Sequence, residues 1–220
     1  GYNNIDIPEA TRRKIPVGYT PDVLTNTTAD FTFALLMAGA RRIPEGYKFV
    51  QEDNWKTWHP LHFLGQDIYG STLGIVGMGR IGYEVARRAT GFDMKILYYD
   101  INRRPDLESQ ISMKYVDMDT LLKDSDFVTL HTNLTNETHH LMSDEQFAKM
   151  KNTAVLINAA RGPVVDHEAL YRALKSGAIG GAALDVTEPE PFPVADPLMS
   201  LPNCLIVPHI ASASVATRKE

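Results

Sequence analysis

The stretch Thr72-Leu-Gly-Ile-Val-Gly-Met-Gly-Arg-Ile-Gly82 decides the fold, because it joins a short apolar run to the glycine spacing of a phosphate-binding turn. Gly77, Gly79 and Gly82 follow the run directly, and a helical pattern begins at Ile81. Glycines at these three places permit a tight turn, the close approach of a pyrophosphate and the packing of helix on strand. The first N–H groups of the helix and its dipole favour a bound anion. The stretch therefore predicts a strand, a loop and a helix that bind a dinucleotide.

An acidic residue follows at the spacing that this interpretation requires. The next apolar run ends at Asp100, 18 positions after Gly82. An acid at about this distance accepts hydrogen bonds from the adenosine ribose and repels a 2′-phosphate. Arg103 and Arg104 favour the opposite choice if their guanidinium groups pair with that phosphate, and otherwise form a solvated turn. We expect NAD as the cofactor, with NADP possible through the two arginines.

From Ser71 onward, apolar runs alternate with helical patterns. Several runs are apolar on both faces, as is typical of central parallel strands that helices cover on both sides. Asp117 and Asp119 are candidate N-caps, and Gly177 is a candidate C-cap. The strands expected are 72–76, 94–99, 127–130, 154–157, 181–184 and 204–207, and the helices are 81–89, 118–123, 143–149 and 166–176. The alternation predicts an α/β fold with a doubly wound parallel sheet.

The first 70 residues do not follow this alternation. A short helix is expected over residues 8–14, and a longer helix over residues 22–42. The longer helix is apolar on nearly every side between residues 29 and 40, which is typical of a helix buried between two bodies. Residues 51–66, with two tryptophans and two histidines, are expected to form an irregular arm.

Size and composition exclude several classes of protein. The 220 residues carry a formal net charge of −5, which is too acidic for a protein that binds nucleic acid over its whole surface. A single cysteine, Cys204, excludes a disulfide framework and fits a reducing compartment. The longest apolar stretch, residues 31–40, is too short to span a bilayer, and no signal peptide opens the sequence. We expect a cytoplasmic protein that binds neither nucleic acid nor membrane.

Polar side chains follow the last three expected strands, at the edge where open α/β sheets bind their ligands. They are Arg161, the acids of the segment 185–190, and His209. Arginine binds a carboxylate through two hydrogen bonds, and histidine beside a carboxylate exchanges a proton near neutral pH. The set suits a small anionic substrate. Taken singly, each residue also has a structural interpretation, as a surface ion pair, a loop residue or a hydrogen-bonded histidine.

Together these motifs resemble the D-isomer-specific 2-hydroxyacid dehydrogenases, most closely the glyoxylate and hydroxypyruvate reductase branch. The matching stretches are 1–6, 28–36, 70–82, 131–138, 158–166, 184–191 and Pro208-His209. The resemblance implies a homodimeric NAD-dependent oxidoreductase that reduces a small 2-oxo acid, such as glyoxylate or hydroxypyruvate, to the D-2-hydroxy acid. Some members of the family act instead as NAD-sensing co-repressors or scaffolds with the same residues, and this is the alternative.

The resemblance also implies a role for each matching residue. Arg161 corresponds to the arginine that holds the carboxylate and carbonyl of the substrate, and His209 to the general acid. Glu190 corresponds to the carboxylate that orients this histidine and keeps it protonated, which leaves Glu188 as a bystander. Asp185 is implied to lie near the nicotinamide carboxamide. The further cofactor-lining positions implied are Arg80, Ile81, Thr132, Asn133, Thr138, Ala159, Ala160, Arg161 and His209.

The sequence departs from the family pattern at two positions. Asn133 replaces a usual proline, and Ala211 replaces a frequent glycine, but neither change removes a catalytic group. The family organisation implies a remnant of a flavodoxin-like substrate domain (1–24), an interdomain helix and dimerisation arm (25–70), a Rossmann dinucleotide-binding domain (71–209) and a return towards the substrate domain (210–220). With most of the substrate domain absent, we expect this chain alone to bind dinucleotide better than it catalyses.

No metal site is expected. His59 and His62 have a spacing of three within the irregular arm, which is a weak signal for a metal. His139 and His140 are expected at the surface, facing opposite ways if the chain is extended there. Cys204 is expected to pack in the core.

Overall fold

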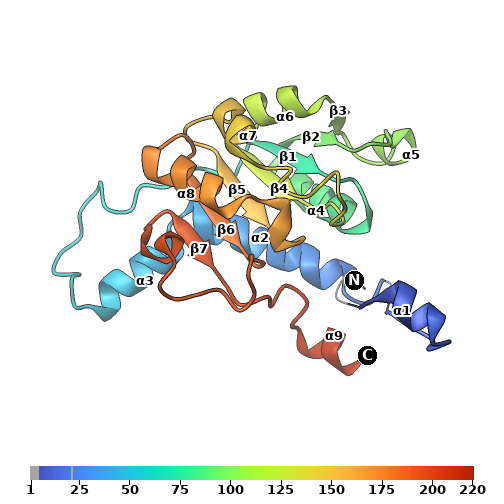
Figure 1. Ribbon diagram of the computed structural model, residues 1–220. Helices are drawn as coiled ribbons and strands as arrows, with labels where there is room; N and C mark the ends of the chain where they lie inside the picture. Colours follow the sequence, from blue (N-terminus) through green and yellow to red (C-terminus); the bar gives the residue numbers. More distant parts are fainter. Residues whose placement is uncertain (1–4, 21) are drawn as a thin grey trace.

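The centre of the computed structural model, which describes residues 5–20 and 22–220, is a parallel sheet of seven strands (Figure 1). The strand order is β3-β2-β1-β4-β5-β6-β7. Chain order reverses between the neighbours β1 and β4, so a ligand-binding crevice is expected at their carboxyl ends. The strands are β1 (Thr72–Val76), β2 (Lys95–Tyr99), β3 (Lys114–Tyr115), β4 (Phe127–Leu130), β5 (Val155–Asn158), β6 (Gly181–Leu184) and β7 (Cys204–Ile206). The α/β prediction with a doubly wound sheet is confirmed.

Helices cover both faces of the sheet, which explains why the central strands are apolar on both sides (Figure 1). One face carries α2 (Thr25–Ala40) and α4 (Arg80–Ala89), whose Leu36 and Val85 pack in one core cluster with Ile75 of β1. The other face carries α6 (Met118–Asp124), α7 (Asp144–Lys149) and α8 (His167–Ser176), packed on Leu130 and Leu156. The remaining helices are α1 (Ile7–Arg12), α3 (Ile43–Gln51), α5 (Pro105–Glu108) and α9 (Val215–Lys219), with short 3-10 turns at Thr90–Phe92, Gly162–Val164 and Pro197–Ser200.

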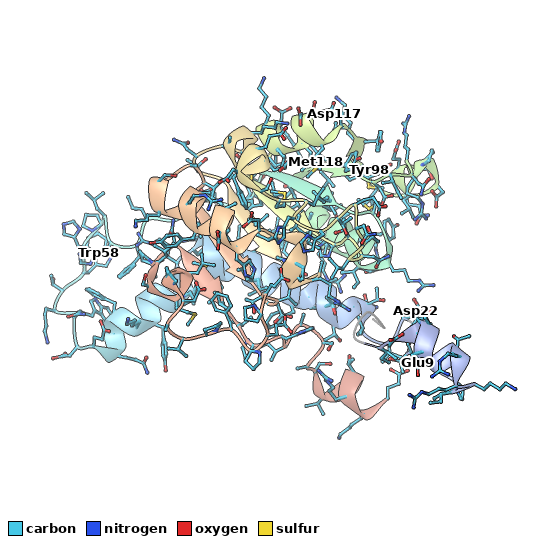
Figure 2. All side chains as sticks on the ribbon, viewed as in Figure 1. Glu9, Asp22, Trp58, Tyr98, Asp117 and Met118 are labelled. Atoms are coloured by element: carbon cyan, nitrogen blue, oxygen red, sulfur yellow. The ribbon has the colours of Figure 1, made fainter. Side chains whose placement is uncertain are left out.

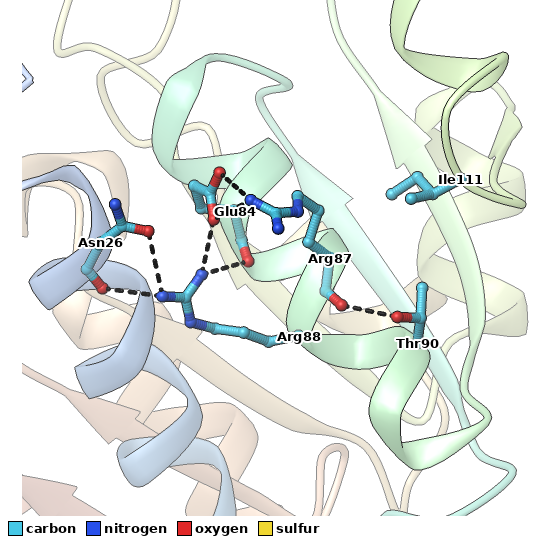
Figure 3. Close-up of a pocket in the computed structure, with 6 residues that line it drawn as sticks. All are labelled: Asn26, Glu84, Arg87, Arg88, Thr90 and Ile111. Carbon is cyan, nitrogen blue, oxygen red and sulfur yellow. Dashed lines mark hydrogen bonds and ion pairs between the residues drawn. The ribbon is translucent and has the colours of Figure 1, made fainter.

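Helix α2 lies on the sheet and beside α4, and it is not buried on every side as the sequence predicts. Leu36 is fully buried, whereas Ala34 is exposed on the opposite side of the helix. The two helices are also joined by polar contacts at their solvent edge. Arg88 of α4 donates to the side-chain oxygen of Asn26 at 3.3 Å and to Glu84 at 2.9 Å, within a polar pocket (Figure 3). Helix α2 is thus held in place by its apolar residues, which pack on the sheet, and by the hydrogen bond from Arg88.

The irregular conformation expected over residues 51–66 is confirmed, and this arm is preceded by helix α3 (Ile43–Gln51), which the sequence analysis did not anticipate. The arm extends away from the sheet and presents Trp58, which is 76% exposed, to solvent (Figures 1 and 2). None of the helices among residues 5–20 and 22–220 is long and apolar enough to cross a membrane. Residues 1–4 of the matching stretch 1–6 lie outside the described residues, as does Pro21.

Most expected elements agree with the structure to within one or two residues. Asp117 caps α6, accepting from the N–H of Thr120 at 2.8 Å, and Gly177 closes α8 at a φ of +74°. Asp119 is not a cap: it lies in the first turn of α6 and pairs with Lys149 at 2.8 Å. Strand β3 was not expected, because a two-residue edge strand leaves no periodic pattern.

Candidate active site

The glycine loop after β1 depends on three glycines for three different reasons. Gly77 has a φ of +96°, and a Cβ there would lie 2.9 Å from the backbone nitrogen of Thr132. A Cβ on Gly82 would collide with the carbonyl oxygen of Gly77. A Cβ on Gly79, by contrast, would meet nothing within 4 Å. The outer two glycines close the loop against the protein, and Gly79 keeps open the space that a pyrophosphate would fill.

The surroundings of the loop fit a bound dinucleotide. Gly79 is the N-cap of α4, so the N–H groups of Arg80 and Ile81 have no acceptor within the helix. Thr132, from the loop after β4, has a buried side-chain oxygen with no hydrogen-bond partner in the structure. Buried polar atoms are nearly always paired, so an orphan beside an open loop indicates a place for a ligand. The Arg80 side chain itself points elsewhere and pairs with Asp22 at 2.9 Å.

Asp100 lies at the end of β2 and contacts this loop directly. One carboxylate oxygen accepts from the N–H of Met78 at 2.7 Å, and the other from the N–H of Asn102 at 2.9 Å. Each oxygen keeps a second lone pair, so both remain able to accept a ribose hydroxyl. The acid predicted from spacing therefore also holds the glycine loop in its conformation.

The two arginines after Asp100 both have carboxylate partners. Arg103 binds Glu108 through two hydrogen bonds, the shorter at 2.8 Å, and Arg104 binds Asp106 in the same way at 2.7 Å. The Arg103 guanidinium lowers the pKa of Glu108 to about 2, and Arg104 lowers the pKa of Asp106. The guanidinium groups of both arginines are thus held beside the short helix α5 by its acids Asp106 and Glu108.

The loop after β4 contains three residues expected at the cofactor. Thr138 donates its hydroxyl hydrogen to the carbonyl oxygen of Asn133 at 2.6 Å and accepts from the N–H of Thr135 at 2.8 Å. These bonds shape the loop that begins at Thr132, opposite Gly77. Their role is to form the loop, and direct contact with a cofactor stays a prediction for Asn133 and Thr138.

Glu190 and His209 lie in contact beyond the ends of β6 and β7. Glu190 Oε2 and His209 Nδ1 are 2.8 Å apart, and Glu190 Oε1 accepts from the N–H of Thr187 at 3.0 Å. His209 has a φ of +51°, a conformation uncommon outside glycine, of the kind that clusters at functional sites. The imidazole is fixed through Nδ1, so Nε2, on the opposite edge of the ring, is the nitrogen that would face a substrate. The two side chains are half exposed.

Asp185 has a role that sequence reasoning missed. Its carboxylate is buried, and its oxygens accept from the N–H groups of Ile210 at 2.7 Å and Ala211 at 2.9 Å. Its carbonyl oxygen accepts from the N–H of His209 at 2.9 Å. Asp185 therefore holds the chain on both sides of the His209 imidazole, and contact with a nicotinamide stays a prediction. Since its partners are backbone groups, no residue pattern indicates them.

Asn158 is a second positioning residue that was not singled out. It ends β5, donates to the carbonyl oxygen of Arg161 at 2.9 Å and accepts from the N–H of Ala160 at 3.0 Å. An asparagine at a strand end is the signal for such a local turn. The turn fixes Ala159 and Ala160. Directly after Arg161, a Cβ on Gly162 would collide with the carbonyl oxygen of Thr187. The loop of Arg161 thus packs against the loop of Glu190.

The predicted residues therefore form two groups along one edge of the sheet. The first, around the glycine loop, comprises Gly77, Gly79, Arg80, Ile81, Gly82, Asp100 and Thr132. The second, beyond β5, β6 and β7, comprises Ala159, Ala160, Arg161, Asp185, Glu190 and His209. A glycine loop at the switch point of a parallel sheet, followed by an arginine and a Glu–His pair, defines a dinucleotide-binding domain with residues for acid–base chemistry.

Comparison with known proteins identifies the family. Residues 33–211 match the family model described as D-isomer specific 2-hydroxyacid dehydrogenase, NAD binding domain. The chain belongs to this family.

The chain is similar to the glyoxylate reductase of Korarchaeum cryptofilum, with 59% identity over 219 residues that cover 99% of this chain and 66% of the relative. Its fold is similar to the crystal structure of the TT0316 protein from Thermus thermophilus, with a TM-score of 0.93, 48% identity and coverage of 100% and 68%. D-lactate dehydrogenase from Aquifex aeolicus, in complex with NAD and lactic acid, gives a TM-score of 0.88, 34% identity and coverage of 100% and 69%. The chain thus spans about two thirds of the length of these proteins.

Proposed function

We propose that the protein is an NAD-dependent oxidoreductase that reduces a small 2-oxo acid, of the glyoxylate or hydroxypyruvate type, to its D-2-hydroxy acid. The observation that carries this proposal is the 2.8 Å contact between Glu190 and His209, next to the loop of Arg161 and on the same sheet edge as the glycine loop. Relatives named glyoxylate reductase and D-lactate dehydrogenase support a reductase over a co-repressor or scaffold.

The side chains divide the proposed reaction between them. The Arg161 guanidinium would bind the substrate carboxylate and orient the neighbouring carbonyl. Reduced nicotinamide, when bound, supplies a hydride to the carbonyl carbon. Protonated His209 would deliver the Nε2 proton to the carbonyl oxygen, so that hydride and proton together convert C=O to CH–OH. Glu190 stabilises the imidazolium through Nδ1 and fixes the direction of Nε2.

For the cofactor, we propose a preference for NAD over NADP. Asp100 lies against the glycine loop, where its negative charge would repel a ribose 2′-phosphate. Arg103 and Arg104 are the residues that could bind this phosphate. Arg103 pairs with Glu108, and Arg104 pairs with Asp106. A 2′-phosphate would therefore have to compete with these two carboxylates for the guanidinium groups.

We propose that, of the expected remnant 1–24, the described residues 5–20 and 22–24 belong together with residues 210–220 to a second lobe. We also propose that the arm mediates a cytoplasmic homodimer. Helices α1 and α9 contain no buried residue, and α9 contacts the body through Thr217, whose Oγ1 lies 2.7 Å from Thr27 Oγ1 of α2. On the arm, Trp55, Trp58 and Leu61 are each more than 60% exposed, and apolar surface of this kind marks an interaction site. Sedimentation equilibrium tests the dimer, which Trp58→Ser should weaken.

The activity is tested by initial rates of NADH and NADPH oxidation with a panel of 2-oxo acids, using the longest form of the protein that its gene encodes. We expect glyoxylate or hydroxypyruvate with NADH to give the highest kcat/KM, and the product to be the D-enantiomer where it is chiral. A preparation that binds NADH yet oxidises it with none of the 2-oxo acids would overturn the proposal. A stoichiometric protein partner in such a preparation would favour the co-repressor alternative.

A further inference from the structure

A second group of chemically active side chains lies beside the proposed catalytic set. His139 and His140, on the turn after β4, and Glu188, on the loop after β6, each offer one ligand atom, and these atoms lie within 4.8 Å of one another. Within residues 5–20 and 22–220, this is the one group of three histidine, cysteine or acidic side chains arranged in this way. We propose that His139, His140 and Glu188 bind a divalent transition-metal ion such as Zn²⁺ or Ni²⁺.

The geometry is close to what such an ion requires. His140 Nε2 and Glu188 Oε2 are 3.5 Å apart. A tetrahedral zinc site with bonds of 2.0–2.1 Å separates its ligand atoms by about 3.4 Å. The rings of His139 and His140 are stacked, with centroids 4.0 Å apart and planes inclined by 23°, in contrast to the opposite orientations expected for an extended chain. All three residues are exposed, so side-chain rotation can converge the nitrogen atoms on one ion without moving the backbone.

The chemistry of the ligands selects the class of metal. Two imidazoles and one carboxylate suit zinc, nickel, cobalt and copper, whereas magnesium and calcium prefer sites made only of oxygen. Three protein ligands leave a position for water. The expected ion is therefore a late transition metal, held near the surface.

The backbone that carries the three ligands is already fixed. The N–H of His140 donates to the carbonyl oxygen of Pro163 at 2.8 Å, and His140 has a φ of +52°. On the other side, the carbonyl oxygen of Glu188 lies 3.0 Å from the Nδ1 of His167. Both ligand-bearing segments are thus attached to the stretch of chain that follows Arg161.

A metal ion bound here would cross-link the loop after β4 to the loop after β6. It would join the turn of His139 and His140 to Glu188, which stands two residues before Glu190. Because a ligand that binds only the folded state raises the free energy of unfolding, metal should raise the midpoint of thermal unfolding. This inference does not depend on the proposed reductase activity.

The chain contains a matched control for the carboxylate ligand. His59 and His62, on the arm, form another stacked pair, with centroids 4.8 Å apart, but they belong to no three-residue group among the described residues. If two stacked histidines were sufficient for metal binding, both pairs would bind the metal ion. If the carboxylate is required, only the pair beside Glu188 binds it tightly.

The test is calorimetric titration of Zn²⁺ and Ni²⁺ into the purified 220-residue chain without an affinity tag. We expect one tight equivalent per chain and a higher thermal midpoint. Glu188→Gln should weaken the affinity by at least about tenfold. The double variant His139→Gln with His140→Asn should abolish the tight site, since asparagine tolerates the left-handed backbone at position 140. Circular dichroism verifies that each variant is folded.

The control variant, His59→Gln with His62→Gln, should keep the tight equivalent and the thermal shift. The proposal is overturned if the wild-type chain has no tight equivalent, if Glu188→Gln binds as tightly as wild type, or if the arm variant is the one that loses binding.

Discussion

The glycine loop after β1 and the loops after β5, β6 and β7 lie on the same sheet edge but are built by opposite means. The loop of Gly77 and Gly79 works through backbone N–H groups and missing side chains, whereas the other loops present the functional groups of Arg161, Glu190 and His209. Substitutions in the first region should therefore change folding or cofactor binding. Substitutions in the second should change the chemistry and leave folding nearly intact.

The largest effect is expected from Gly82→Ala. The new methyl group would collide with the carbonyl oxygen of Gly77, a backbone atom that cannot move aside without distorting the loop. We expect the free energy of unfolding, measured with urea, to fall by about 3 kcal/mol.

Gly79→Ala is the matched control for this prediction, because its Cβ meets nothing within 4 Å. This variant should lose no more than about 1 kcal/mol of stability, but it should bind NADH at least tenfold more weakly, since the methyl group occupies the place of the pyrophosphate. Normal NADH affinity in Gly79→Ala would show that the pyrophosphate lies elsewhere.

In the second region, Glu190→Gln should lower kcat by about 100-fold, which is about 2.7 kcal/mol, because a neutral amide does not stabilise the imidazolium. The NADH dissociation constant and the urea midpoint should stay at their wild-type values. Glu168→Gln makes the same change at an exposed position of α8 and should leave kcat unchanged. A wild-type kcat in Glu190→Gln would remove Glu190 from the mechanism.

His131 follows β4, the strand that lies between β1 and β5 in the sheet, and it should make stability depend on pH. Desolvation of its imidazole lowers the pKa of His131 to about 3, from about 6.5 in the unfolded chain. The unfolded state therefore binds more protons between these values, so the contribution is complete above pH 6.5 and decreases as the pH falls. We expect a loss of about 2 kcal/mol at pH 5 in urea unfolding. His131→Gln should flatten this slope, and an unchanged slope would assign it to other groups.

The smallest effect concerns the choice of cofactor. Asp106→Asn would release Arg104 towards a ribose 2′-phosphate, and the ratio of kcat/KM for NADPH to that for NADH should rise a few-fold. Asp144→Asn breaks the similar Asp144–Arg172 pair on α7 and α8 and should leave the ratio unchanged. A ratio that stays constant in both variants would leave Asp100 as the sole determinant in the account.

The sequence predicts the glycine loop and most of the sheet well because their signals are local. Apolar runs and glycine spacings are consequences of burial and backbone sterics at the residues themselves. The role of Asp185 was missed because its partners are the N–H groups of residues 25 and 26 positions away, which any residue except proline supplies. Helix α3 was missed because it contains no buried residue, and β3 was missed because two residues form no periodic pattern.

The histidine pair shows the same limit. From the sequence, His139 and His140 face opposite ways if extended, but the chain turns there and stacks the two rings. Their approach to Glu188 joins residues almost 50 positions apart and depends on how two loops pack on the chain after Arg161. Sequence spacing contains no information about that packing.

The most direct test of the account is to compare His209→Gln with the wild-type protein, measuring kcat for glyoxylate and the NADH dissociation constant on the same samples. The account predicts that kcat falls by about 1000-fold, within the range for loss of a general acid, while NADH affinity changes at most about threefold, because His209 is only one of several residues implied to line the cofactor. Wild-type turnover in this variant, or a parallel loss of NADH binding, would contradict the account. The account assigns cofactor binding to the backbone of the glycine loop and the chemistry to the side chains after β5, β6 and β7.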